Sequence, residues 1–363
     1  MAEMMKFGDF ASFRYGKMPI KKKITESGKY PIYSGYRYVG FYDEYNTEAD
    51  QLIIVARGVG GTGDVKLTKD RCYLTNLSIA ANIDSNVVLP EYLYYYFKPR
   101  SLRYLDSGSA QSQITISDLE RVIIPIPPLS DQKAICSYLK LLDVKIQNNK
   151  NINENLEQQA KSLFTEMFDS KESNFWKQGV LSDIAEITMG QSPSGNSYNE
   201  NGQGTVFFQG RAEFGFRFPT IRLFTSEPKR IAQKNDTLMS VRAPVGDLNV
   251  AHEECCIGRG LAAIHSKDNH QSFVHYTMFF LHRELDVFNG EGTVFGSINR
   301  NALNSMPIRV PPIDLMDKFE NIVSPMDKLI RTNFDEICHL QAIRDSILPK
   351  LMAGEIDLSK IKP

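Results

Sequence analysis

Two stretches of the chain repeat apolar positions at alternating spacings of four and three residues. The first seam consists of Ile135, Leu139, Leu142, Ile146, Asn149, Asn153, Leu156, Ala160, Leu163 and Met167, and the second of Phe319, Val323, Met326, Ile330, Asn333, Ile337, Leu340, Arg344, Ile347 and Leu351. A seam sustained at this period predicts two long helices that form a coiled coil. An asparagine near the middle of each seam would fix their register.

Each helix would be roughly 55 Å long at 1.5 Å per residue. Neither can bury its own seam, so we expect the two helices to be each other's partners. An antiparallel pair with a pseudo-two-fold axis is favoured, because parallel packing would require the second half of the chain to cross over the first. The alternative is that each helix packs only on the domain that precedes it.

The rest of the chain also contains an internal sequence repeat. The first copy contains Gly108–Ile114, Leu119, Ile124 and Pro127-Pro128, and 184 positions later the second contains Gly292–Ile298, Leu303, Ile308 and Pro311-Pro312. Upstream the offset changes: Asp9 and Gly16 match Asp183 and Gly190 at 174, Tyr33-Ser-Gly35 matches Phe208-Gln-Gly210 at 175, and Val59-Gly60 matches Val245-Gly246 at 186. Changing offsets indicate insertions in loops of a shared fold.

The Pro-Pro pairs mark the two places where a variable half gives way to a helix, because proline suits a helix start. The expected domains are 1–126, 127–173, 174–310 and 311–363. Within the variable halves, residues 51–56, 65–67 and 122–126 are typical of short strands, whereas 92–97 and 272–282 are typical of buried helices. The predicted fold class is therefore α+β: two mixed α/β domains joined by two long antiparallel coiled-coil helices in a pseudo-two-fold repeat.

Composition adds little to this picture. The 363 residues include 42 Lys and Arg against 43 Asp and Glu, and 42% are hydrophobic, which is typical of a folded protein rather than a disordered one. Five scattered cysteines indicate a reducing compartment, and no apolar run approaches the 18 residues or so of a membrane span, so a cytoplasmic location is expected. If nucleic acid is the partner, the basic residues must be grouped on one surface, because the chain has no excess of positive charge.

Two segments, 17–45 and 211–230, interleave basic side chains with aromatic ones. Arginine suits bidentate contacts to guanine, and glutamine or asparagine suits adenine. On residue type alone the candidates for DNA contact are Lys21, Lys22, Arg37, Arg57, Gln111, Gln113, Arg211, Arg217, Arg222, Arg242 and Arg259. The alternative is a set of half-exposed strands, which show the same alternation of charged and aromatic residues.

The apparent motifs for cofactor and metal binding are each incomplete. Gly58–Gly63 fits GxGxxG, but the alternating residues after it predict a strand rather than the helix that would hold a pyrophosphate. His252, Cys255 and Cys256 lack a second pair of zinc ligands at suitable spacing. We therefore expect neither a metal site nor a cofactor, and no catalytic activity in this chain.

The whole architecture resembles the specificity (S) subunit of type I restriction–modification systems. The most specific parts are Ile124–Gln132, which leads into the first helix, Val310–Ile313, which leads into the second, and the end of the chain, Ile347–Asp357. The second repeat departs from the first, with Asp314-Leu-Met-Asp317 in place of Ser130-Asp-Gln-Lys133. The two copies are therefore expected to differ in their local contacts at the start of each helix, within the same class of protein.

The resemblance implies a non-catalytic subunit in which two target-recognition domains each read one half of a bipartite site on double-stranded DNA. It also implies that the helices act as a spacer and dock two methyltransferase subunits, which restriction and translocation subunits then join. Different sequences in the two variable halves predict an asymmetric site. The faces left outside the seam, with Tyr138, Leu141, Phe164 and Phe168, are the expected docking surfaces. The alternative is a tandem-repeat scaffold that binds no DNA.

Overall fold

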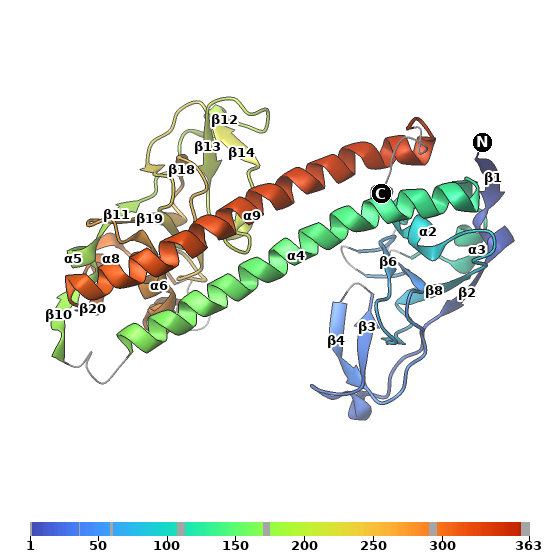
Figure 1. The fold of residues 1–363 in the computed structure, drawn as a ribbon, viewed down its shortest axis with the longest axis horizontal. Helices are drawn as coiled ribbons and strands as arrows, with labels where there is room; N and C mark the ends of the chain where they lie inside the picture. Colours follow the sequence, from blue (N-terminus) through green and yellow to red (C-terminus); the bar gives the residue numbers. More distant parts are fainter. Residues whose placement is uncertain are drawn as a thin grey trace. The chain divides into compact units, whose positions relative to one another are not determined.

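The computed structural model describes residues 2–35, 37–58, 61–106, 113–169, 175–289 and 296–356. The chain divides into two compact units, of which unit 1 comprises Met1–Asn148 and Glu336–Pro363, and unit 2 comprises Asn149–Asp335. Each unit therefore contains one end of both long helices, α4 (Leu129–Phe168) and α9 (Ile313–Ala353), drawn in green and red in Figure 1. Both helices begin directly after the Pro-Pro pairs, as predicted.

Unit 1 is built on a four-stranded antiparallel sheet with the order β2-β8-β5-β6. A three-stranded sheet, β4-β3-β7, and a strand pair, β1-β9, accompany it. The strands are β1 (Glu3–Lys6), β2 (Ala11–Tyr15), β3 (Tyr30–Ser34), β4 (Arg37–Tyr42), β5 (Leu52–Val55), β6 (Val65–Leu67), β7 (Tyr73–Leu74), β8 (Ser78–Ile83) and β9 (Ile123–Ile126). The helices are α1 (Phe7–Phe10), α2 (Pro90–Phe97) and α3 (Ile116–Glu120), with 3-10 turns η1 (Lys21–Lys23) and η2 (Leu102–Leu105).

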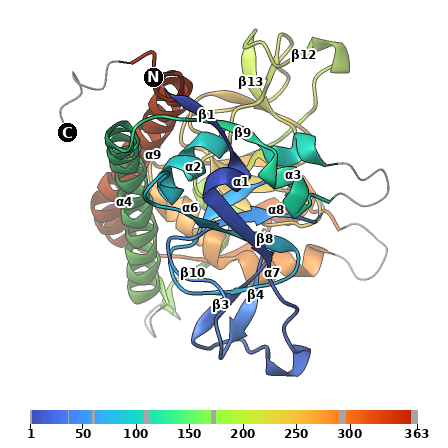
Figure 2. The same cartoon turned by 90° about the vertical axis from the view of Figure 1, so that its right-hand side faces the viewer.

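The core of unit 1 joins the sheet to the long helices. Tyr92 and Leu93 of α2 are fully buried in one cluster with Leu139 of α4 and Leu351 of α9. Figure 2, which looks on to this unit, shows α1, α2 and the β1-β9 pair lying together. Gln132 of α4 is also fully buried, where its side chain accepts from the Leu89 amide at the start of α2. The first turns of α4 are thus part of the domain itself.

Unit 2 repeats this topology. Its four-stranded sheet has the order β11-β19-β16-β17, and its second sheet has the order β12-β14-β13-β18-β15. The strands are β10 (Lys177–Val180), β11 (Ala185–Met189), β12 (Tyr198–Asn199), β13 (Thr205–Phe208), β14 (Leu223–Thr225), β15 (Ile231–Ala232), β16 (Thr237–Ser240), β17 (Leu248–Val250), β18 (Cys255–Ile257), β19 (Leu261–Ser266) and β20 (Pro307–Val310). The helices are α5 (Leu181–Ile184), α6 (Gln271–Phe280), α7 (His282–Asp286) and α8 (Arg300–Asn304), with 3-10 turns η4 (Gly195–Ser197), η5 (Arg211–Glu213) and η6 (Val287–Asn289).

The predicted repeat is confirmed, with two additional strands, β12 and β15, in the second sheet of unit 2. The sheet β2-β8-β5-β6 corresponds to β11-β19-β16-β17, the pair β1-β9 corresponds to β10-β20, and the parallel pair β3-β7 corresponds to β13-β18. The predicted strands at 51–56, 65–67 and 122–126 are β5, β6 and β9, and the predicted helices are α2 and α6. The fold class is therefore two mixed α/β domains with a pair of long helices.

Within each unit the two long helices run antiparallel. In unit 2, the Asn333 side-chain amide donates to Asn153 Oδ1 at 2.8 Å, and Asn153 Nδ2 donates to the Ile330 carbonyl at 3.1 Å. In unit 1, Arg344 of α9 pairs with Asp143 of α4 at 2.8 Å. Twelve of the twenty seam positions are buried, namely Ile135, Leu139, Ile146, Asn149, Asn153, Ala160, Phe319, Val323, Ile330, Asn333, Ile337 and Leu351. The other eight are half-buried, namely Leu142, Leu156, Leu163, Met167, Met326, Leu340, Arg344 and Ile347.

The helices also pack on the domains, but the alternative that each helix packs only on its preceding domain is wrong, because α4 and α9 also contact each other. Phe164 and Phe168 of α4 lie in the same buried cluster as Phe319 of α9 and Phe273 of α6. The expectation that these two α4 phenylalanines remain available for docking is wrong, because α6 covers them. Leu141, by contrast, is 56% exposed.

Among the described residues, no helix has the length and apolar character that crossing a membrane requires.

Candidate nucleic-acid interface

In unit 1, several strand ends meet at one edge of the main sheet. The Ala56 amide, just after β5, donates to the Leu77 carbonyl at 2.9 Å, and the next residue, Arg57, forms an isolated β-bridge with Gln113. The Lys17 amide, just after β2, donates to the Leu74 carbonyl at 2.9 Å. We call the five side chains at these ends strand-end cluster 1; they are Lys17, Ser34, Arg57, Asn76 and Gln113.

Unit 2 builds the same arrangement at the equivalent positions. Arg242, just after β16, forms an isolated β-bridge with Ser297, and the neighbouring Val241 amide donates to the Gly260 carbonyl at 2.9 Å. The Gln191 amide donates to the Ile257 carbonyl at 2.9 Å. Strand-end cluster 2 thus comprises the counterparts of the first five, in the same order: Gln191, Gln209, Arg242, Arg259 and Ser297.

A glycine allows the close approach of strand ends in both clusters. A Cβ on Gly16 would lie 2.3 Å from the Leu74 carbonyl oxygen, and a Cβ on Gly190 would lie 2.1 Å from the Gly258 carbonyl oxygen. No other residue fits without moving the backbone. The glycines matched in the sequence repeat are therefore needed where the turn before β8 or β19 crosses the end of β2 or β11.

The candidates of unit 1 lie in three places. Lys21 and Lys22 are exposed on η1, and Arg37 is exposed on β4. Arg57 and Gln113 come together in strand-end cluster 1, where Arg57 Nε is buried and has no hydrogen-bond partner among the described residues. Gln111 lies outside the described residues.

The candidate arginines of unit 2 differ in whether a described carboxylate compensates their charge. Arg211 pairs with Asp247, and Arg222 pairs with Glu213 at 2.7 Å, so both charges are largely compensated. Arg242 and Arg259 are exposed in strand-end cluster 2. Neither of these two side chains is ion-paired to another described residue.

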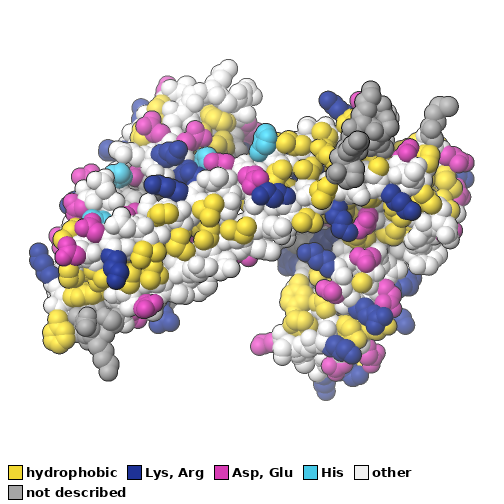
Figure 3. Space-filling model, viewed as in Figure 1, with side chains coloured by type: hydrophobic (Ala, Val, Ile, Leu, Met, Phe, Trp, Pro, Cys, Tyr) yellow, Lys and Arg dark blue, Asp and Glu magenta, His cyan; other side chains and the backbone are white. Residues whose placement is uncertain are grey.

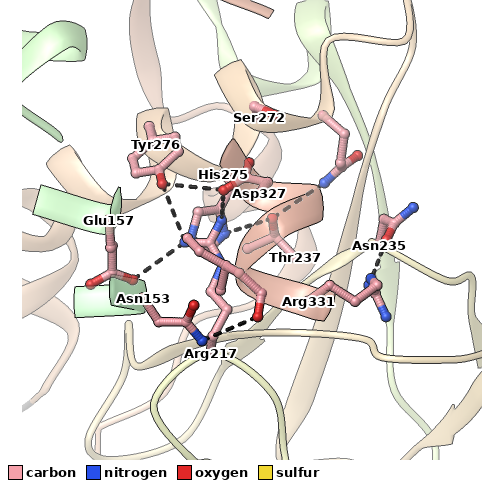
Figure 4. Close-up of polar contacts among 12 residues, drawn as sticks. Asn153, Glu157, Arg217, Asn235, Thr237, Ser272, His275, Tyr276, Asp327 and Arg331 are labelled. Carbon is pink, nitrogen blue, oxygen red and sulfur yellow. Dashed lines mark hydrogen bonds and ion pairs between the residues drawn. The ribbon is translucent and has the colours of Figure 1, made fainter. Parts of the chain in front are cut away.

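Arg217 does not fit a DNA-contact role. Its side chain is only 5% exposed and pairs with Asp327 of α9 at 2.6 Å and with Glu157 of α4 at 3.3 Å (Figure 4). Burial lowers the pKa of the guanidinium, but Asp327, Tyr276 and Glu157 outweigh this effect and hold the pKa above its usual value. Arg217 therefore cannot reach a phosphate or a base edge; it ties the loop before β14 to both helices.

The sequence-based selection missed six of the ten cluster residues: Lys17, Ser34, Asn76, Gln191, Gln209 and Ser297. The repeat aligns Gln191 with Lys17 and Gln209 with Ser34, but neither of these partners was selected, so the offset alone would not have found them. Residue type alone does not separate these side chains from other polar side chains in the chain.

The described residues of the metal motif and of the glycine motif have other structural roles. Within the part of the chain that the structure describes, no three His, Cys, Asp or Glu side chains are grouped so as to hold a metal ion. His252 instead bonds Asp335 at 2.6 Å, and Cys255 is buried in β18. Gly63 leads into strand β6 rather than a helix, so Gly58–Gly63 connects two strands, although residues 59–60 lie outside the described residues.

Comparisons with known proteins identify the family. The sequence profile of the type I restriction modification DNA specificity domain matches residues 2–158 and again 174–337. The chain is 34% identical over 301 residues to the MjaX specificity subunit of a type I restriction enzyme from Methanocaldococcus jannaschii, covering 75% of this chain and 69% of that protein. It is 25% identical over 327 residues to the MjaIX specificity subunit of the same organism, covering 79% and 74%.

A crystal structure of the type I restriction–modification S subunit from M. genitalium has the same fold, with a TM-score of 0.68 and 20% identity over 96% of this chain and 95% of that one. The chain belongs to the type I restriction–modification DNA specificity family. It is a DNA-recognition subunit with two recognition domains rather than an enzyme, and a scaffold that binds no DNA is not favoured.

Proposed function

We propose that each unit reads one half of an asymmetric bipartite site on duplex DNA through its strand-end cluster. The observation that carries this proposal is the paired construction of the clusters: the same backbone hydrogen bonds present different side chains at four of five positions. Identical readers related by a dyad would read a palindrome, as in dimeric DNA-binding proteins. Two different readers on one scaffold favour a site whose halves differ.

The long helices are proposed to set the spacing between the half-sites. Helices of 40 and 41 residues have lengths of about 60 Å, or about one and three-quarters turns of B-DNA. Each helix contributes to both units, so a bend or a shift in either one would move a reading surface. The buried Asn153–Asn333 hydrogen bond supports this role, because a polar seam contact holds one register.

The outward faces of the helices are proposed to dock methyltransferase subunits, one on each face, with restriction and translocation subunits joining through them. Exposed apolar side chains on these faces support docking: Leu141, Val144 and Ile152 on α4, and Ile322 and Leu329 on α9. Figure 3 shows hydrophobic side chains gathered along these helices. Exposed apolar stripes of this kind are typical of protein interfaces, and the internal repeat favours two partners.

Large partners also fit the net charge of −1. A chain with few uncompensated cations at its strand-end clusters releases few counterions by itself, so most of the phosphate contacts would come from the partner subunits. The chain itself would then supply the base contacts.

Duplex binding measured over a series of salt concentrations tests the proposal, with and without the methyltransferase subunits from the same operon. We expect a linear fall of log K against log salt and one preferred bipartite sequence, which mapping of methylated bases in the host genome should reproduce. Absence of DNA affinity even in the presence of the methyltransferase would refute it. Leu142→Asp with Met326→Asp should relax the preferred spacer length, and an unchanged spacer would contradict the role of the helices. Gln158→Asp, at an exposed position of α4 outside both the seam and the apolar docking residues, is the control that keeps the spacing.

A further inference from the structure

One position is the same in both strand-end clusters. Arg57 and Arg242 each follow the central strand of the four-stranded sheet, β5 or β16, and each forms the isolated bridge that closes the cluster. The residue before each one accepts an equivalent hydrogen bond, from the Ile114 amide to Ala56 at 3.0 Å and from the Ile298 amide to Val241 at 3.1 Å. The two arginines therefore occupy one structural position of a duplicated scaffold.

The other four positions differ between the clusters. The pairs are Lys17 with Gln191, Ser34 with Gln209, Asn76 with Arg259, and Gln113 with Ser297. Two unlike half-sites have chemically identical sugar–phosphate backbones and differ only in their bases. Phosphate contacts position a protein on DNA, whereas base contacts specify the sequence. We propose that Arg57 and Arg242 are phosphate clamps, one in each half-site, and that the four unlike pairs carry the sequence discrimination.

Cluster 1 contains two buried polar atoms without hydrogen-bond partners among the described residues, Arg57 Nε and Asn76 Oδ1. Buried polar groups are almost always satisfied in native proteins, so unsatisfied ones call for an explanation such as an absent ligand. A phosphate oxygen accepts from a guanidinium, and a base edge supplies donors for an asparagine oxygen. Both atoms belong to side chains of strand-end cluster 1, where the proposed ligand would bind.

Cluster 2 holds its variable arginine on a rigid turn. Arg259 lies between Gly258 and Gly260, and a Cβ at either glycine would lie 2.9 Å from the Gln209 carbonyl oxygen. The Arg259 amide donates to Ser192 Oγ at 3.3 Å. With its backbone held in this way and its side chain exposed, Arg259 is suited to the bidentate geometry that guanine requires, whereas Asn76 at the matching turn is suited to adenine.

This inference rests on the proposed function, and the experiment separates the two. The full-length chain, purified with its methyltransferase subunits, selects its preferred sequence from randomised duplexes, and the affinity for that sequence is then followed from low to high salt. Arg57→Gln or Arg242→Gln should weaken binding to all sequences alike, reduce the salt slope by about 0.9, and leave the preferred bases unchanged. Arg57→Lys and Arg242→Lys should retain most of the slope, because lysine still contacts phosphate as a point charge.

Two charge-removal variants serve as controls. Arg71→Gln removes an exposed arginine that is ion-paired with Glu48 in unit 1, and Lys267→Gln removes an exposed lysine just after β19, at the end opposite the Arg259 turn. Neither should change the slope measurably. Circular dichroism and the melting temperature of each variant verify folding.

The discriminating arm is Arg259→Asn, which gives cluster 2 the residue of cluster 1. It should change the preferred base at one position in one half-site, from guanine to adenine, with a loss of about tenfold to hundredfold on the original sequence and no effect on the other half. The inference is overturned if Arg57→Lys or Arg242→Lys changes the preferred bases, or if Arg259→Asn leaves both half-sites unchanged. In either case the proposed function stands, provided that the wild-type complex binds a bipartite site; a wild-type complex without DNA affinity removes both.

Discussion

Replacing Arg217 by methionine should destabilise unit 2 far more than replacing a neighbouring surface arginine. Arg217 lies 2.6 Å from Asp327 and 3.3 Å from Glu157, which are 22% and 17% exposed. Methionine keeps much of the side-chain volume but leaves Asp327 without its cation partner and leaves Glu157 paired with Lys161 alone, at 2.8 Å. The main consequence is therefore an uncompensated carboxylate at Asp327, beside Tyr276. Figure 4 shows Arg217 together with both carboxylates.

Removing one partner from a buried ion pair costs about 3–5 kcal/mol. Because both carboxylates keep some exposure, we expect the lower end of this range, about 3 kcal/mol. With a urea dependence of about 2 kcal/mol per molar, the unfolding midpoint should fall by about 1.5 M. The matched control is Arg211→Met, which breaks an exposed pair with Asp247 in the same loop and should cost less than about 1 kcal/mol.

The single tryptophan, Trp176, lies in unit 2, so its fluorescence reports the unfolding of that unit. Urea titrations of wild type, Arg217→Met and Arg211→Met give the three free energies of unfolding. A double-mutant cycle with Asp327→Asn isolates the coupling between Arg217 and that carboxylate. A loss below about 1 kcal/mol for Arg217→Met, equal to that of the control, would refute the view that the arginine clamps the loop to the helices.

Three further perturbations have defined outcomes. Gly190→Ala places a Cβ 2.1 Å from the Gly258 carbonyl oxygen and should cost about 1–3 kcal/mol or more by the same fluorescence titration, whereas an unchanged midpoint would show that the strand ends are not held together. Burial raises the pKa of Asp143, but Arg344 and Lys98 outweigh it and hold the pKa below its usual value. The stability from this lowered pKa is therefore present above about pH 4 and lost as the pH falls through the folded value, so Arg344→Gln should flatten the loss of stability measured by urea unfolding from pH 6 to pH 3. Cys338 is exposed and should be the first cysteine to react with a thiol reagent in the native protein. Burial raises the pKa of three other thiols, to about 11 for Cys72 and to about 12 for Cys136 and Cys255, and so makes them less reactive.

The helices, the repeat and the class of protein could be predicted from sequence because their evidence lies in local order. The spacing of seam residues such as Leu139, Leu142 and Ile146 reveals the helical period directly, and a proline pair marks where a helix begins. The repeat needed only the comparison of one half of the chain with the other. These features depend on neighbours within a few residues, or on the collinear order of matching residues in the two halves, and both can be recognised without a structure.

The interface could be predicted only in part. Arg57 and Gln113 were selected by residue type, and an isolated β-bridge beyond the end of β5 brings them together although they lie far apart in the chain. Gln209 and Asn76 were missed because nothing in their local sequence states which strand ends they meet. Sheet order arises from non-local pairing, which residue type does not encode.

The sequence by itself determined that the chain holds two related domains and two long helices, because periodicity and repetition are properties of the order of residues. Only the tertiary structure decided which arginines are available to DNA. Arg217 and Arg242 both lie in the second variable half and look alike in sequence, but one is enclosed by Glu157 and Asp327 and the other is exposed beside Ser297. The physical reason is that the availability of a charge depends on the solvent and counter-charges around it, and those neighbours come from distant parts of the chain.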